Sequence, residues 1–175
     1  MLGHGAGGGI ESVDLQQVAA GVVTAGFRVV LVEQPWRVAG RRIAPAPATL
    51  DLAWITVVRT LRPGAPVVVG GRSAGARVAC RTASELRAAA VVCLAFPLHP
   101  PGRRDRSRSG ELRAPVVPVL VVQGDRDPFG SAREVARAAP GADVVRVRGA
   151  DHSLARIDLV APVDVVIRLL RQVAE

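Results

Sequence analysis

Three residue types are missing from this 175-residue chain: it has no lysine, no asparagine and no tyrosine. Each of its 23 basic residues is therefore an arginine, and aromatic residues make up only 3% of the sequence. Proteins that bind nucleic acid on a basic face usually add aromatic side chains on which bases stack. The net charge of +8 alone thus does not predict a nucleic-acid partner.

The arginines are scattered, with one dense group formed by Arg103, Arg104, Arg106 and Arg108. We interpret this group as part of a solvated loop, because runs of like charge usually face water. A surface for an acidic ligand, a partner or nucleic acid is the alternative.

Cysteine is scarce, and no stretch approaches 18 uninterrupted apolar residues. Cys80 and Cys93 lie in apolar segments, which favours buried free thiols over a disulfide or a metal site. No charged-then-apolar signal opens the chain. We therefore expect a cytoplasmic protein that binds neither membrane nor nucleic acid and needs no cofactor or metal. The sequence does not indicate an oligomeric state.

Apolar strand-like runs alternate with helical patterns along the whole chain, without an internal repeat or linker. This alternation predicts a single α/β domain over residues 1–175, with a parallel sheet covered on both faces. Strands are expected at residues 27–32, 66–69, 89–95, 116–122 and 144–147. Helices are expected from Ser12 to Gly26, at 50–61 with an end at Pro63 and Gly64, at 76–84, at 131–139, and after Pro162. Residues 34–47 and 97–113 are expected to be loops.

One of these strands runs directly into Gly71-Arg72-Ser73-Ala74-Gly75, and a helical pattern follows at once. A serine on a tight strand-to-helix turn presents its hydroxyl at the edge of the sheet, and flanking glycines leave room for the turn. Ser73 is therefore a candidate nucleophile. The alternative is a helix-capping serine in a glycine-rich turn.

Two further polar residues follow strands downstream. Asp127 comes after the strand at 116–122, and His152 comes after the strand at 144–147. The order Ser73, Asp127, His152 is the nucleophile–acid–base order of α/β-hydrolases. Asp125 is an alternative acid, but we favour Asp127, and Asp151 is expected to face elsewhere.

A glycine-rich loop at residues 4–8 would bring backbone N–H groups close to an anion. We expect the N–H groups of Ala6 and Ala74 to form an oxyanion hole, with His4 ordering the loop. A flexible terminus is the alternative. Trp36 and His99 each follow another strand, so both are candidates for lining the substrate pocket.

The sequence resembles the small, lidless α/β-hydrolases described as dienelactone-hydrolase-like. The motifs that carry the resemblance are HGAG, EQPWRVAGRR, GGRSAGAR, FPLHPPG and QGDRDPFG, at residues 4–7, 33–42, 70–77, 96–102 and 123–130. The resemblance implies a minimal, three-layer α/β-hydrolase fold with a mostly parallel sheet. It also implies a catalytic triad of Ser73, Asp127 and His152. Dienelactone hydrolases proper use a cysteine where Ser73 stands, so lactone hydrolysis is not implied.

Only Met1, Leu2 and Gly3 precede the glycine-rich loop, although a strand should support it. We expect either a pared-down sheet or a natural start further upstream, and we favour the second. The leading functional hypothesis is a serine hydrolase that acts on small carboxylic esters or related acyl compounds. The alternative is a non-catalytic protein-interaction module, because the resemblance extends to a component of a eukaryotic chromatin-associated complex.

Overall fold

The computed structural model describes residues 1–61, 64–154 and 158–175. Its strands are β1 (Leu2–Gly3), β2 (Leu31–Val32), β3 (Val68–Arg72), β4 (Ala90–Leu94), β5 (Val119–Gly124) and β6 (Asp143–Val147). Its helices are α1 (Val13–Thr24), α2 (Pro35–Val38), α3 (Pro47–Leu61), α4 (Ala74–Thr82), α5 (Ser109–Arg113), α6 (Ala132–Ala138) and α7 (Val160–Ala174). Strands and helices alternate along the chain, as the sequence predicts.

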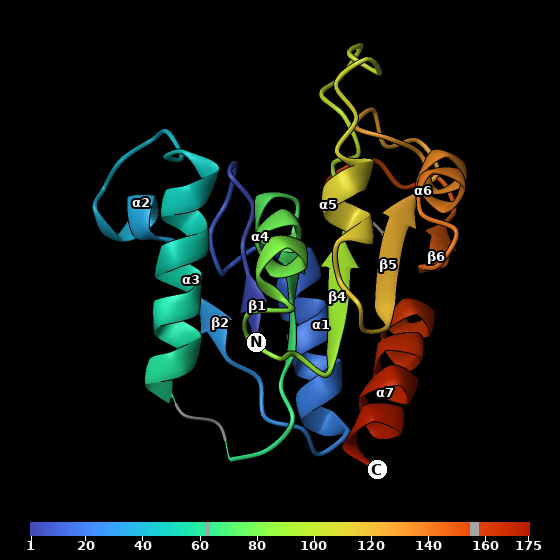
Figure 1. Cartoon of the computed structure of the whole chain (residues 1–175). Helices are drawn as coiled ribbons and strands as arrows, with labels where there is room; N and C mark the ends of the chain where they lie inside the picture. Colours follow the sequence, from blue (N-terminus) through green and yellow to red (C-terminus); the bar gives the residue numbers. More distant parts are fainter. Residues whose placement is uncertain (62–63, 155–157) are drawn as a thin grey trace.

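The strands form one sheet in the order β2-β1-β3-β4-β5-β6, and every pairing between neighbours is parallel. The carboxyl ends of the strands therefore meet at one edge of the sheet, the upper edge in Figure 1. Loops that follow the strands gather at this edge, which is where ligands of open α/β sheets bind.

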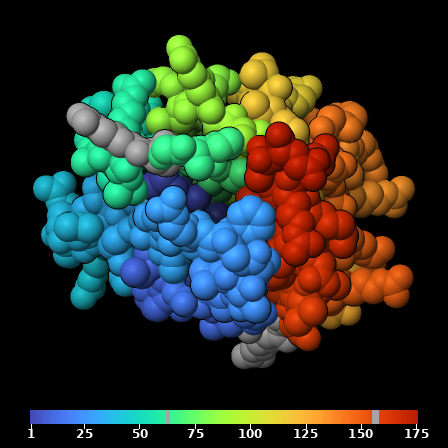
Figure 2. Space-filling view, turned by 90° about the horizontal axis from the view of Figure 1, so that it is seen from below, coloured from blue at the N-terminus to red at the C-terminus, as the bar shows by residue number. Residues whose placement is uncertain are grey.

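Helices cover both faces of the sheet, because side chains alternate along each strand. Val91 and Cys93 pack into the core beneath α3, α4 and α6, whereas Val92 and Leu94 pack beneath α1 and α7. Figure 2, a view from below, shows α1 in blue beside α7 in red. The result is a three-layer domain.

The strand at the N-terminus is short but lies inside the sheet. β1 pairs with β2 on one side and with β3 on the other. Its backbone is fixed by hydrogen bonds from Leu2 N to Val30 O and from Gly70 N to Met1 O, both 2.9 Å long. β1 thus lies between β2 and β3 and leads directly into the glycine-rich loop at residues 4–8.

Several element bounds differ from those expected. The strand expected at 27–32 is paired only over Leu31–Val32, and the expected loops at 34–47 and 97–113 contain the short helices α2 and α5. The expected helix end at Pro63 lies outside the described residues. The helix expected at 131–139 is α6, and Ser131 and Glu134 form a capping box at its start.

The two cysteines are buried, unlinked thiols, with Cys80 Sγ 3.5 Å from Cys93 Sγ. The hydrogen bond with Cys80 and burial raise the pKa of the Cys93 thiol. Among the helices of the described ranges, none combines the length and apolar character needed to cross a bilayer.

Candidate active site

Ser73 occupies a strained turn between β3 and α4. Its φ of 51° and ψ of −107° lie in a region that residues with a Cβ seldom adopt. A Cβ on Gly71 or on Gly75 would collide with the carbonyl oxygen of Gly3 in β1. The two glycines therefore let β1 pass directly beside the turn, which presents Ser73 at the upper edge of the sheet.

A continuous chain of hydrogen bonds joins Ser73, His152 and Asp127. His152 Nε2 lies 2.9 Å from Ser73 Oγ, and His152 Nδ1 lies 2.8 Å from Asp127 Oδ2. The Asp127 side chain is fully buried, whereas 16% of the His152 side chain is exposed. The structure thus brings together the three residues proposed from the sequence, with the imidazole between hydroxyl and carboxylate.

Both carboxylate oxygens of Asp127 have partners besides His152. Gln123 Nε2 donates to Oδ2 at 2.9 Å, and the backbone N–H of Phe129 donates to Oδ1 at 2.8 Å. Gln123 itself is fully buried and also donates to the carbonyls of Phe96 and Gly130. These hydrogen bonds fix the orientation of the carboxylate toward His152.

Asp125, the alternative acid, points away from His152. It pairs with Arg146 Nη2 at 2.8 Å and accepts a hydrogen bond from Gly149 N at 2.7 Å. The hydrogen bond from Arg146 is the main reason why the pKa of Asp125 lies below its ordinary value. Asp125 therefore stabilises the loop before His152 through its hydrogen bond from Gly149.

The phenyl ring of Phe129 packs against the imidazole of His152. The ring centroids are 4.2 Å apart and the planes are inclined by 32°. Phe129 therefore limits the movement of the imidazole from one side, while its backbone N–H holds Asp127. Neither role was apparent from the sequence, in which Phe129 is only the residue after Pro128.

The glycine-rich loop lies beside Ser73, and His4 orders it. His4 is fully buried; its Nδ1 donates to Gly5 O at 2.8 Å, and its Nε2 accepts a hydrogen bond from Gln34 N at 2.8 Å. A Cβ added to Gly5 would come within 3.2 Å of Ser73 Cβ. Ala74 is the first residue of α4, so its N–H has no partner within the helix. Ala6 follows Gly5 and is exposed.

Trp36 and His99 are both buried near this region. Trp36 stands edge-on to the His4 ring and lines a cavity of about 570 Å³ together with Arg41, Arg42 and Thr49. The backbone N–H of His99 donates to Phe129 O at 3.0 Å, and its ring Nδ1 donates to Pro100 O. His99 thus contacts Phe129, which packs on His152, whereas Trp36 contacts His4 of the glycine-rich loop.

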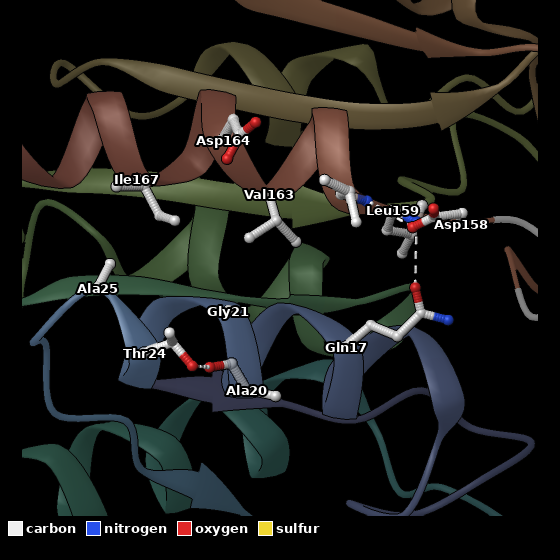
Figure 3. Close-up of a pocket in the computed structure, with 11 residues that line it drawn as sticks. Gln17, Ala20, Gly21, Thr24, Ala25, Asp158, Leu159, Val163, Asp164 and Ile167 are labelled. Atoms are coloured by element: carbon white, nitrogen blue, oxygen red, sulfur yellow. Dashed lines mark hydrogen bonds between the residues drawn. The ribbon is translucent and has the colours of Figure 1, made fainter.

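A larger hollow of about 830 Å³ lies elsewhere, between α1 and α7. Figure 3 shows Gln17 and Gly21 on one wall and Val163 and Ile167 on the other. Ser73, Asp127 and His152 are not among its lining residues. This hollow is thus separate from the candidate active site.

The arginine group at residues 103–108 lies mostly at the surface, with 50% of the Arg103 side chain and 79% of the Arg104 side chain exposed. Arg103 pairs with Asp105, and Arg104 pairs with Glu134 at 2.9 Å. Arg108 Nη1 donates to the carbonyl of Pro97, and burial lowers the pKa of Arg108. That this group is part of a solvated loop and not a surface for a ligand or partner stays a prediction.

Three solved structures illustrate what the fold resembles. An α/β serine hydrolase homologue from Coxiella burnetii has a TM-score of 0.75 and 17% identity, with 97% of this chain and 85% of that chain covered. An α/β serine hydrolase without a lid from Xanthomonas campestris has a TM-score of 0.72 and 21% identity, with 98% and 80% covered. The ferulic acid complex of Est1E from Butyrivibrio proteoclasticus has a TM-score of 0.79 and 15% identity, with 99% and 88% covered.

A search of curated proteins finds no match to this chain. The sequence does match the model of the alpha/beta hydrolase domain family over residues 1–159, which includes every member of the Ser73–His152–Asp127 chain. By this match, and with a six-stranded parallel sheet between two helical layers, the protein belongs to the alpha/beta hydrolase domain family.

Proposed function

We propose that this protein is a serine hydrolase of small carboxylic esters or related acyl compounds, with Ser73, His152 and Asp127 as its catalytic triad. The observation that carries the proposal is the pair of hydrogen bonds at His152, 2.9 Å to Ser73 Oγ and 2.8 Å to Asp127 Oδ2. Serine hydrolases among the structural neighbours support the proposal at the level of the fold.

In the first half of the reaction, Ser73 Oγ attacks the acyl carbon while His152 Nε2 accepts its proton. Asp127 holds the other imidazole nitrogen and stabilises the positive charge that develops on the ring. The negative oxygen of the tetrahedral intermediate is stabilised by the N–H groups of Ala74 and Ala6. His152 then gives the proton to the leaving alcohol as the C–O bond breaks.

In the second half, water attacks the Ser73 ester. His152 takes a proton from the water and returns one to Ser73 Oγ when the acid leaves. The strained turn keeps Ser73 Oγ next to His152 throughout, so no movement of the nucleophile is required.

We place the chain in the dienelactone-hydrolase-like subgroup on its motifs, and in the cytoplasm on its two free, buried thiols. We expect small substrates, because among the described residues no segment between strands is long enough for a large lid. Aromatic acyl esters are worth testing beside short aliphatic ones, since Est1E was crystallised with ferulic acid.

The test is hydrolysis of p-nitrophenyl acetate and butyrate by the purified protein. We expect turnover in wild type and a loss of 10³-fold or more in Ser73→Ala, a rough value for removal of a nucleophile. Ser84→Ala, which alters an exposed serine in the turn that follows α4, is the matched control. Equal activity in Ser73→Ala and Ser84→Ala would reject the proposal, and a folded but inactive wild type would favour an interaction module.

A further inference from the structure

Arg72 precedes the nucleophile in the chain, yet its side chain turns inward. Only 14% of the side chain is exposed. Its Nε donates to Asp14 Oδ2 at 3.0 Å, and its Nη2 donates to the backbone carbonyl of His152 at 3.0 Å. One guanidinium therefore joins α1 to the loop that carries the base.

The Asp14 carboxylate is buried in its contact with Arg72. Its side chain is 1% exposed, and Arg72 is the cation paired with it. Burial raises the pKa of Asp14, whereas Arg72 and the N–H of Leu15 favour its ionised form. Asp14 lies in the first turn of α1, so its backbone position is set by the helix. It is a fixed support for Arg72.

The third arm of the guanidinium lies against the glycine-rich loop. A Cβ on Gly5 would come within 2.7 Å of Arg72 Nη1 and 3.2 Å of Ser73 Cβ. The segments that follow β1, β3 and β6 thus meet at the guanidinium of Arg72. These segments carry the proposed oxyanion donor Ala6, the nucleophile Ser73 and the base His152.

We propose that Arg72, held by Asp14, is a positioning residue that sets the backbone of His152 and the loop at residues 4–7 relative to Ser73. The inference rests on the proposed function, since it concerns the same active site. Arg72 suits this role because it is covalently next to Ser73. A rigid, forked guanidinium can donate in two directions at fixed angles, which a single ammonium cannot do.

A buried ion pair that only stabilises the fold is the competing explanation. It can be separated from positioning by removing both charges together, because Arg72→Met/Asp14→Leu leaves no unpaired buried charge and keeps apolar bulk. If the pair were merely structural, this double variant would keep wild-type turnover. Arg59→Met/Glu85→Leu is the matched control, since it removes an exposed pair with a 2.9 Å contact far from Ser73.

We expect Arg72→Met/Asp14→Leu to melt close to wild type but to lose kcat on the order of 100-fold with little change in KM, because a misplaced base slows chemistry more than binding. Arg72→Lys, which keeps a charge for Asp14, is expected to fold and to lose about tenfold. Wild-type kcat in either folded Arg72 variant would overturn the inference.

A second readout does not depend on activity. The chain has three histidines, so ring ¹⁵N–¹H spectra can resolve His152 and follow its Nδ1–H bond to Asp127. We expect this signal to shift or broaden in Arg72→Met/Asp14→Leu but not in the Arg59 control. An unchanged His152 signal would overturn the positioning role. An inactive wild type in which the signal responds to Arg72 would reject the proposed function alone.

Discussion

His152 Nε2 lies 2.9 Å from Ser73 Oγ, although 79 positions separate the two residues in the sequence. The contact arises because each residue follows a parallel strand, so that both emerge at the same edge of the sheet. The imidazole is fixed on its other side by Asp127. This arrangement makes several consequences measurable.

Replacement of the acid should separate Asp127 from its neighbour Asp125. Asp127→Asn is expected to lower kcat by about 10⁴-fold, because an amide no longer holds the reactive tautomer of His152. Asp125→Asn is expected to leave kcat near the wild-type value, since Asp125 pairs with Arg146 and Gly149 instead. Steady-state kinetics on one ester would check both variants. A larger loss of kcat in Asp125→Asn than in Asp127→Asn would contradict the assignment of Asp127 as the acid.

The loop beside Ser73 should tolerate a methyl group at one glycine but not at another. In Gly5→Ala the new Cβ meets Arg72 Nη1 and Ser73 Cβ, so we expect kcat/KM to fall about 10–100-fold. In Gly7→Ala the Cβ meets no atom of the protein within 4 Å, so activity should persist. Circular dichroism and melting curves would show that both variants fold. Equal activities would contradict the placement of this loop.

Ion pairs between two arginines of α4 and Glu111 of α5 predict that the stability of the fold depends on pH. Arg77 binds Glu111 with contacts of 2.7 and 2.8 Å, and Arg81 adds a third at 3.0 Å. Burial alone would raise the pKa of Glu111, but the two arginines outweigh it and hold the pKa below the ordinary value of 4.5. The unfolded chain therefore binds the proton first as the pH falls.

The stabilisation from Glu111 is thus fully present above pH 4.5 and is lost as the pH falls through the lower pKa of the folded state. Glu111→Gln should cost about 1–3 kcal/mol at pH 7, typical of hydrogen bonds to charged groups, and should flatten the acid limb of the stability curve. Urea unfolding at several pH values would measure this. A variant whose acid limb is as steep as that of wild type would refute the assignment.

Much of the architecture could be predicted because its signals are local. The runs that became β4 and β5 are almost wholly apolar, as expected for strands buried on both faces, and Ser131 with Glu134 marks the start of α6 within four residues. Ser73, Asp127 and His152 each follow a strand, and in a parallel sheet such residues meet at the same edge. Their proximity could therefore be predicted as well.

The weaker signals failed where an element is set by its neighbours. Residues 27–32 have a strand-like pattern, but β2 lies at the edge of the sheet and pairs with β1. Because β1 has two residues, the paired part of β2 is limited to Leu31 and Val32. Helices α2 and α5 have four and five residues, too few for a period of 3.6 to stand out. Their positions depend on the burial of Trp36 and Leu112.

The contacts that support the proposed active site could not be predicted from spacing. Arg72 meets partners 58 and 80 positions away, so nothing near it in the sequence shows that its side chain turns inward. Gln123 did leave a signal, because it is a polar residue at the end of an otherwise apolar strand. Such a residue needs buried partners, and Asp127 is one of them.

Mass spectrometric mapping of a fluorophosphonate adduct tests the central claim most directly. The proposal predicts one adduct per chain, located on Ser73, absent in Ser73→Ala and formed much more slowly in His152→Ala. It also predicts that Ser84→Ala reacts like wild type. A folded wild-type protein that forms no adduct, or whose adduct lies on another residue, would contradict Ser73 as the nucleophile.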